Sequence, residues 1–421
     1  MNQLKDELDA VKYEVDASEP TLSDSRHQGL FEKLRLSRLA KVAATAGALS
    51  LAFSASTVGA ETSSSSFQAF GGQQLAGYNS NKIWVTDQQA AEQEAELIAA
   101  SGADAVRIQE PYTVGGAEIN NDAERLCNAA IVANKNHLRL IIAMVGHYSD
   151  GRLGFMPSSE SQKNRFTTAV GSMMWTLAGS EHGCVPDQKD ITIGLFDEPD
   201  NPTFNSNQYV DGQWVAPQRE VSLLSYAYPR LKAEALKPGL GVNLTIIGGE
   251  LSSPSSEHDN TSFIKKMGQI IQQRKLTGPI MDVFALHQYA NSYDTSPEAP
   301  NNSFNPNVVD AVRTTFGADM PVIYDELGAY SETPKGKEHQ YIVRLPAAVK
   351  PFTGTGQGDF YSRFISKAIC HNVQGVMIFH FSDDPGDTLR TGVAFPDNSP
   401  KPSQEIVRQS IDNPLGNTVC P

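Results

Sequence analysis

Residues 194–202, GLFDEPDNP, hold an apolar run that stops abruptly at two acids and a proline. The apolar part has the composition of a buried strand, and a proline does not continue such a strand. Residues 321–328, PVIYDELG, repeat the design later in the chain. Buried strands that each end in a charged residue are typical of parallel sheets, whose carboxyl ends collect functional side chains.

Outward from these two stretches, strand-like and helix-like segments alternate along the chain. The predicted strands are 75–78, 105–108, 138–145, 191–196, 244–247, 283–286, 322–324 and 376–379. The predicted helices are 87–101, 121–136, 161–177, 218–237, 262–275, 308–316, 359–372 and 404–411. Eight strand–helix units predict an α/β fold, a (β/α)8 TIM barrel that forms one domain over residues 72–415.

The net charge of the chain limits its partners. A formal charge of −14 disfavours nucleic acid and anionic membrane surfaces, because both prefer a basic face. We therefore expect a neutral or cationic substrate, and no membrane contact beyond export.

The first 60 residues are predicted to be a targeting segment rather than part of the fold. Three basic residues, Arg35, Arg38 and Lys41, precede an uncharged run over 42–60 that ends in small residues. This pattern is typical of a signal peptide, with a weak anchor or an Ala-rich linker as the alternatives. We expect a secreted, periplasmic or cell-surface protein, with residues 61–71 as a Ser-rich tether.

Four cysteines suit an oxidising compartment if they pair. Of the three connectivities, Cys127 with Cys184 and Cys370 with Cys420 closes the shorter loops and is the one we predict. Their spacing matches no zinc module. No His-x-His or His-Glu-x-x-His motif occurs either, so the sequence predicts neither a metal nor a cofactor.

Two other classes of chemistry lack a motif. The sequence holds no Gly-x-Ser-x-Gly elbow and no phosphate-loop lysine, so acyl transfer and nucleotide hydrolysis have no local support. The glycine-rich residues 354–358, GTGQG, follow no strand of the dinucleotide-binding type and are interpreted as a loop.

A barrel of this kind has its active site at the carboxyl ends of the strands. The polar residues that we single out at or shortly after the ends of the predicted strands are Arg107, His147, Tyr148, Glu198, Glu250, His287, Tyr289, Glu326 and His380. Two glutamates at such positions supply the carboxyl pair that cleavage of a glycosidic bond requires, one protonated and one ionised.

Several short motifs occur in the order found in one group of enzymes. Residues 197–199 (DEP) end the fourth strand, 287–289 (HQY) the sixth and 326–328 (ELG) the seventh, and 392–393 (GV) with 399–402 (SPKP) follow the eighth. From about residue 72 to 412 the chain thereby resembles the clan A glycoside hydrolases, of cellulase-like or family 39-like type. This resemblance implies a retaining β-glycosidase that cleaves a polysaccharide or oligosaccharide, with endo action favoured by the long loops after strands three, four and six.

The resemblance also implies roles for individual residues. Glu198 corresponds to the acid/base and Glu326 to the nucleophile. Arg107 and Tyr289 correspond to the residues that hold the nucleophile, and His147 and His287 to contacts of the sugar hydroxyls. A structural ion pair is the alternative for Arg107, and ordinary buried or exposed histidines are the alternative for the imidazoles.

Two departures from the clan pattern concern substrate recognition. Asp197 stands where an asparagine donates to the sugar 2-hydroxyl, and an ionised aspartate only accepts, either from that hydroxyl or from a 2-amino group. His380 and Phe381 stand where a tryptophan platform is usual, and Phe381 is expected to stack on a sugar. Trp214 is a second candidate platform, with plain packing as its alternative. Glu250 is interpreted either as substrate-facing or as structural.

Two functional alternatives stay open at this point. One is an exo-glycosidase or transglycosylase that uses the same site. The other is a non-catalytic carbohydrate-binding barrel, in which Asp197 marks a loss of activity.

Overall fold

The computed structural model describes most of the chain after residue 73. The described residues are 74–84, 87–113, 123–147, 156–202, 204–206, 208–252, 259–290, 304–333, 335–341, 351–386, 390–415 and 420. The predicted targeting segment over residues 1–60 and the tether over 61–71 lie outside them. Among the described residues, no helix has the length and apolar character needed to cross a membrane.

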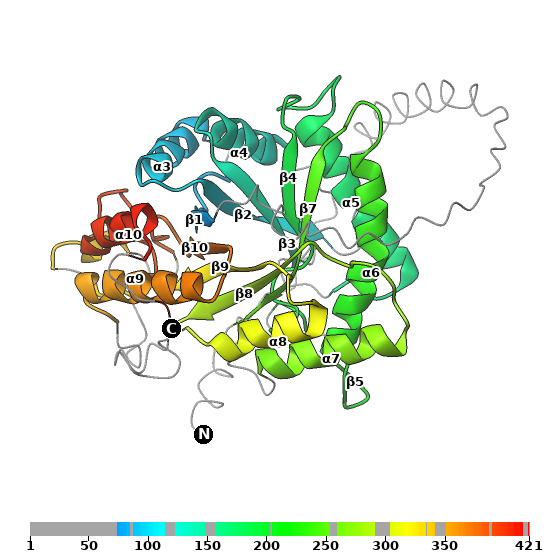
Figure 1. The fold of residues 1–421 in the computed structure, drawn as a ribbon. Helices are drawn as coiled ribbons and strands as arrows, with labels where there is room; N and C mark the ends of the chain where they lie inside the picture. The colour runs from blue at the N-terminus through cyan, green and yellow to red at the C-terminus, as the bar shows by residue number, and fades with distance from the viewer. Residues whose placement is uncertain are drawn as a thin grey trace, which may run out of the picture. The chain divides into compact units, whose positions relative to one another are not determined.

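Eight parallel strands close into a barrel (Figure 1). They are β1 (Leu75–Asn79), β2 (Ala105–Thr113), β3 (Arg139–His147), β4 (Asp190–Gly194), β7 (Asn243–Leu251), β8 (Val283–Tyr289), β9 (Val322–Gly328) and β10 (Gly375–Ile378). Their order around the barrel is β1-β10-β9-β8-β7-β4-β3-β2. The predicted TIM barrel is confirmed, and each predicted strand corresponds to one of these eight.

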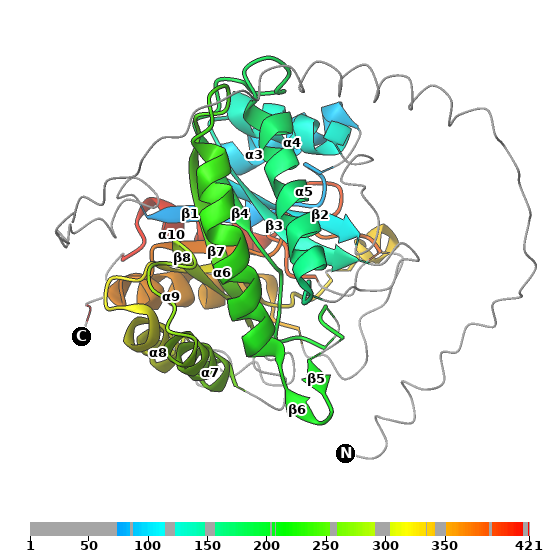
Figure 2. The ribbon, with the colours of Figure 1, turned by 90° about the vertical axis from the view of Figure 1, so that its right-hand side faces the viewer.

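Helices surround the barrel and cover its outer face (Figures 1 and 2). They are α3 (Gln88–Ala100), α4 (Ala123–Lys135), α5 (Glu160–Ala178), α6 (Ala216–Ala235), α7 (Asn260–Gln273), α8 (Pro306–Phe316), α9 (Gly354–Cys370) and α10 (Pro402–Asp412). Local sequence explains where several begin. Ser159 and Gln162 form a capping box at the start of α5, and Asp87 and Asp259 cap α3 and α7, which pairs the free N–H groups of the first turn.

The barrel interior contains a small apolar cluster of its own, separate from the larger core between strands and helices. Its members are Leu75, Ala105, Ile141, Ile247, Val283, Ala285, Ile323 and Met377. Side chains alternate between the two faces of a strand, so Arg107 and Gln109 follow Ala105 along the inward face of β2. The apolar cluster is therefore continued by polar residues toward the carboxyl ends of the strands.

The glycine-rich residues 354–358 form the first turns of α9, so their interpretation as a loop was wrong. Thr353 caps this helix by accepting from the N–H of Gly356. A Cβ atom at Gly354 would lie 2.9 Å from Pro402, and one at Gly358 would lie 2.8 Å from Ile406. These glycines allow α10 to pack closely on α9.

Two disulfides join Cys127 to Cys184 and Cys370 to Cys420, which confirms the predicted connectivity. The first joins α4 to the segment after α5. The second ties the last described residue of the chain to the end of α9. The sequence did not predict the short hairpin of β5 (Tyr209–Val210) and β6 (Gln213–Trp214), which lies between β4 and α6.

Candidate active site

Charged side chains from four barrel strands and the turn after β4 meet at the carboxyl end of the barrel. Arg107 of β2 is fully buried and is surrounded by carboxyl groups. Its guanidinium nitrogens lie 2.6 Å from Asp197, 3.0 Å from Glu250, 3.3 Å from Asp325 and 2.6 Å from Glu326. Burial alone would lower the pKa of Arg107, but these four acids raise it well above its ordinary value, so it stays charged.

Glu326 of β9 is held by donors on both carboxylate oxygens. Arg107 donates to Oε1 at 2.6 Å, and the hydroxyl of Tyr289 donates to Oε2 at 2.6 Å. Burial and the charges of Glu326 and Glu198 raise the pKa of Tyr289 well above its usual value, which keeps its hydroxyl a donor. Gln109, which the sequence analysis did not single out, adds a third donor to Glu326 at 3.2 Å.

Glu198 follows β4 in a turn where its backbone φ is +47°. Its Oε1 lies 2.9 Å from Nδ1 of His287, and its Oε2 accepts from the amide of Asn201 at 2.5 Å. The same Nδ1 of His287 lies 3.4 Å from Glu326. Carboxylate oxygens of Glu198 and Glu326 come within 4.8 Å of each other.

His287 carries positive charge between these acids. Burial alone would lower its pKa, but Glu326 and Asp325 raise it well above the usual value, and hydrogen bonds with Asp325 and Glu198 add to the rise. Together with Arg107, it supplies the cationic charge that faces the buried carboxyl groups.

Asp197 accepts from Arg107 through Oδ1 and from Gln109 through Oδ2, at 2.6 and 3.2 Å. Burial raises its pKa to about 7, against the opposing effect of Arg107, and the charge of Glu326 adds to the rise. Near neutral pH this acid is therefore partly protonated, whereas the sequence analysis treated it only as ionised.

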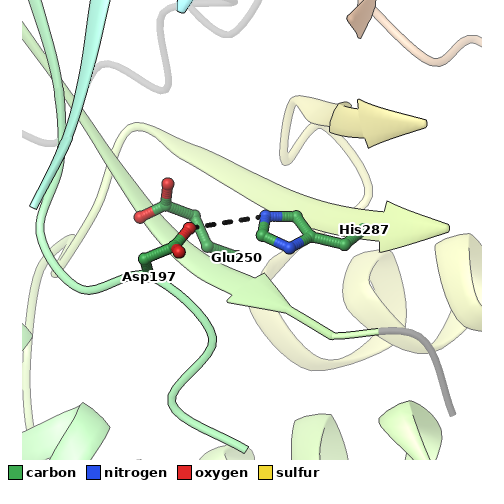
Figure 3. Close-up of side chains that lie close together, drawn as sticks. All are labelled: Asp197, Glu250 and His287. Carbon is green, nitrogen blue, oxygen red and sulfur yellow. Dashed lines mark ion pairs between the residues drawn. The ribbon is translucent and has the colours of Figure 1, made fainter. Parts of the chain in front are cut away.

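Two further acids complete the cluster. Glu250 of β7 and Asp325 of β9 are both fully buried. Burial would raise the pKa of Asp325, but Arg107 and His287 lower it, so it is an anion. Figure 3 shows Glu250 beside Asp197 with His287 opposite them. Glu250 was singled out after a predicted strand, whereas Asp325, which directly follows the predicted strand 322–324, was not singled out beside Glu326.

The aromatic candidates are placed differently from what the sequence predicted. Phe381 is fully buried and packs edge-on against Tyr78 in the core, so its ring has no face open to a sugar. β10 ends at Ile378, and Phe379 rather than Phe381 is the aromatic that contacts Tyr289, with ring centroids 5.7 Å apart.

No hydrogen bond or ion pair among the described residues joins the other predicted contacts to this cluster. Trp214 packs on Phe263 of α7, with centroids 5.6 Å apart, which corresponds to the plain-packing alternative. His380 is buried against Phe379, and burial lowers its pKa to about 3, so it is neutral. Tyr148 and the side chain of His147 lie outside the described residues.

Carboxylate and imidazole atoms this close together also invite comparison with a metal site. Asp197, Glu250 and His287 bring one such atom each within 4.8 Å of one another. However, the guanidinium of Arg107 contacts both acids and would repel a divalent cation at the same place. Arg107 therefore takes the place beside these two acids that a metal cation would need.

The fold and the site together define the class of protein: a (β/α)8 barrel with paired glutamates at the carboxyl end of its strands. No family model and no curated protein matches the chain. The GH5_18 enzyme from Streptomyces cattleya, solved in complex with GlcNAc, is similar in structure with a TM-score of 0.58 and 14% identity, covering 83% of this chain and 82% of that chain.

Two further solved structures are similar at the same level. A GH5_18 variant from Bifidobacterium longum subsp. longum ATCC 55813, in complex with Manβ1-4GlcNAc, has a TM-score of 0.54 and 15% identity over 83% of this chain and 80% of that chain. The exo-β-1,4-mannosidase Op5Man5 from Opitutaceae bacterium strain TAV5 has 0.54 and 14%, over 81% of this chain. The chain spans 59% of that enzyme's length. The structural similarity is thus to family 5 rather than specifically to family 39, and it establishes the fold.

Proposed function

We propose that this chain is a retaining β-glycosidase that cleaves a polysaccharide or oligosaccharide, with Glu326 as nucleophile and Glu198 as acid/base. The observation that supports this most directly is the approach of their carboxylate oxygens to within 4.8 Å. Retaining enzymes hold the two carboxyl groups about 5–5.5 Å apart, whereas inverting enzymes need about 6.5–9.5 Å to admit a water.

In the first step, an oxygen of Glu326 attacks the anomeric carbon while protonated Glu198 gives its proton to the departing glycosidic oxygen. The bond from carbon to the leaving oxygen breaks, and a covalent glycosyl ester forms on Glu326. Arg107 and Tyr289, each 2.6 Å from Glu326, donate hydrogen bonds to the attacking carboxylate and hold it in place.

In the second step, Glu198 acts as a base and takes a proton from water, whose oxygen attacks the anomeric carbon. The ester to Glu326 breaks, and the sugar leaves with its original anomeric configuration. An acceptor sugar in place of water would give transglycosylation. His287, which contacts both glutamates, stabilises negative charge as it passes from one carboxyl group to the other.

Specificity for the sugar is proposed to depend on Asp197 and Gln109, which bridge Arg107 and Glu326 beside the nucleophile. An oligosaccharide ligand is supported by one of the similar GH5_18 structures, which holds the disaccharide Manβ1-4GlcNAc. We further propose that the chain acts in the endo mode on a longer polymer. An extracytoplasmic location is supported by the two disulfides.

The test is turnover of a panel of aryl β-glycosides and soluble polysaccharides by the full chain, beside Glu326→Ala, Glu198→Ala and the control Glu96→Ala on the exposed face of α3. We expect Glu326→Ala to abolish turnover and azide to restore it by replacing the missing nucleophile. Glu198→Ala should spare activated aryl substrates and lose the others, since only poor leaving groups need the acid.

The size of the products separates the remaining alternatives. Mixed oligosaccharides indicate endo action, single sugars indicate exo action, and longer products indicate transglycosylation. Glycan binding without turnover of any panel member would refute the glycosidase and favour the non-catalytic barrel.

A further inference from the structure

The carboxyl group of Glu250 reaches the centre of the cluster through an irregular stretch of β7. The register between β7 and β8 shifts between Gly248 and Leu251, and φ is +86° at Gly249 and +42° at Glu250. A non-glycine residue rarely adopts such a φ, and bulges of this kind redirect a side chain next to a site. The backbone is thus bent so that Glu250 points toward Arg107, 3.0 Å away.

The neighbouring strand leaves room for this side chain. A Cβ atom at Gly194 of β4 would lie 2.3 Å from Oε2 and 2.4 Å from Oε1 of Glu250. Only glycine therefore fits at that position as long as Glu250 points inward. Three features therefore place the fully buried carboxyl group of Glu250: the backbone bulge, the strained φ and the glycine that the neighbouring strand requires.

Five charged or titratable groups surround this part of β7. They are Arg107 of β2, Asp197 after β4, Glu220 of α6, which accepts from the N–H of Gly249, His287 of β8 and Asp325 of β9. Oε1 of Glu250 accepts from Arg107, whereas Oε2 has no hydrogen-bond partner among the residues that the structure describes. Buried polar atoms are nearly always paired, so Oε2 requires an explanation.

Asp325 supplies one, since it lies against the same guanidinium as Glu250, 3.3 Å from Arg107, and its charge acts on Glu250. Two ionised carboxylates offer each other only acceptors, but a protonated Glu250 donates its O–H to Asp325 and pairs the buried oxygens. The proton also removes one negative charge from a site where four carboxyl groups compete for Arg107.

We propose that Glu250 is a positioning residue that stays protonated at neutral pH, donates to Asp325 and so leaves the charge of Arg107 to Glu326 and Asp197. This inference rests on the proposed glycosidase function for its effect on activity, but not for the proton itself. Burial, and then the charge of Asp325, raise the pKa of Glu250 well above its ordinary value, which agrees with the geometry.

Glu250→Gln is the sharpest test, because a glutamine keeps both contacts: its oxygen accepts from Arg107 and its amide donates to Asp325. Infrared spectra of the full chain at neutral pH report protonated carboxyl groups through a C=O stretch that carboxylates lack. Relative to the wild type, Glu250→Gln should lose intensity in this band, and Glu96→Gln on the exposed face of α3 should not. An unchanged band in Glu250→Gln would overturn the proposal.

The effect on activity is measured as kcat/KM against pH. Glu250→Gln should stay within about tenfold of the wild type at neutral pH, since it preserves both hydrogen bonds. Glu250→Ala, which lacks both contacts, should lose more. In an Asp197→Asn background, where the titration of Asp197 near pH 7 is absent, Glu250→Gln should move the alkaline decline to higher pH because glutamine cannot ionise. An unchanged decline in that background, or a Glu250→Gln loss as large as that of Glu250→Ala, would refute the positioning role.

The two proposals fail separately. If the wild type turns over no substrate, the glycosidase function is refuted, and the infrared comparison still decides whether Glu250 carries a proton.

Discussion

Replacing Glu220 with glutamine is expected to remove a large pH dependence of stability. Glu220 lies on the inner side of α6, is 1% exposed, and accepts from the N–H of Gly249 at 3.2 Å. Its other oxygen has no hydrogen-bond partner among the described residues. Burial, and to a smaller extent the nearby Asp200, raise its pKa to about 8.

The sign and size of this pH dependence follow from the pKa of Glu220 in the unfolded and in the folded chain. In the unfolded chain, Glu220 loses its proton near its ordinary pKa of 4.5, whereas in the folded chain it keeps the proton up to about pH 8. The folded state therefore binds more protons across this window, and stability falls as pH rises. Each pKa unit corresponds to about 1.4 kcal/mol, so the loss is roughly 3 kcal/mol by pH 7 and roughly 5 kcal/mol by pH 8.

The measurement is the free energy of unfolding in urea, followed from about pH 4.5 to about pH 8, for the wild type, Glu220→Gln and the exposed control Glu96→Gln. At the acidic end, the wild type and Glu220→Gln should agree to within about 1 kcal/mol, the scale of one altered hydrogen bond. Toward pH 8, Glu220→Gln should become the more stable protein, and Glu96→Gln should follow the wild type. Parallel curves for the wild type and Glu220→Gln would refute a protonated Glu220.

Two further changes have defined outcomes. Asp197→Asn keeps the acceptor for Arg107 and supplies an amide donor in place of a group with a pKa of about 7. Any step in the dependence of kcat/KM on pH near that value should therefore vanish, while substrates with a 2-hydroxyl are still cleaved. A step that persists would show that another group titrates there. Replacing Cys127 and Cys184 together by alanine opens a crosslink between residues 57 apart. The free energy of unfolding measured in urea should fall by about 4 kcal/mol. An unchanged urea midpoint would contradict stabilisation by this disulfide.

Most of the fold was predictable because alternation of strands and helices is a local property of the sequence. All eight barrel strands and the eight helices around them were anticipated, with boundaries that shift by a few residues, whereas the β5–β6 hairpin was not. The exception at residues 354–358 has a tertiary cause. Glycine usually weakens a helix, but Gly354 and Gly358 lie where α10 approaches α9, and a contact between segments far apart in sequence leaves no local pattern.

The site was predictable only where a polar residue directly follows a strand. Arg107, Glu198, His287, Tyr289 and Glu326 were singled out on this basis and meet in the structure. Gln109 and Asp325 also follow predicted strands but were not singled out, because which of two adjacent residues points into the barrel depends on register and bulges that the sequence does not reveal. Phe381 was assigned to the site from its position after a strand, whereas Phe379 is the aromatic that contacts Tyr289.

The departure from the clan pattern at Asp197 is explained by the charges around it. Arg107 and His287 face five carboxyl groups, those of Asp197, Glu198, Glu250, Asp325 and Glu326. Burial raises the pKa of Asp197 to about 7 and that of Glu250 well above its ordinary value. In their protonated forms, both acids add no charge, and Asp197 then offers the donor that an asparagine would supply. The aspartate should therefore narrow the pH range of the proposed reaction on its alkaline side while leaving its mechanism intact.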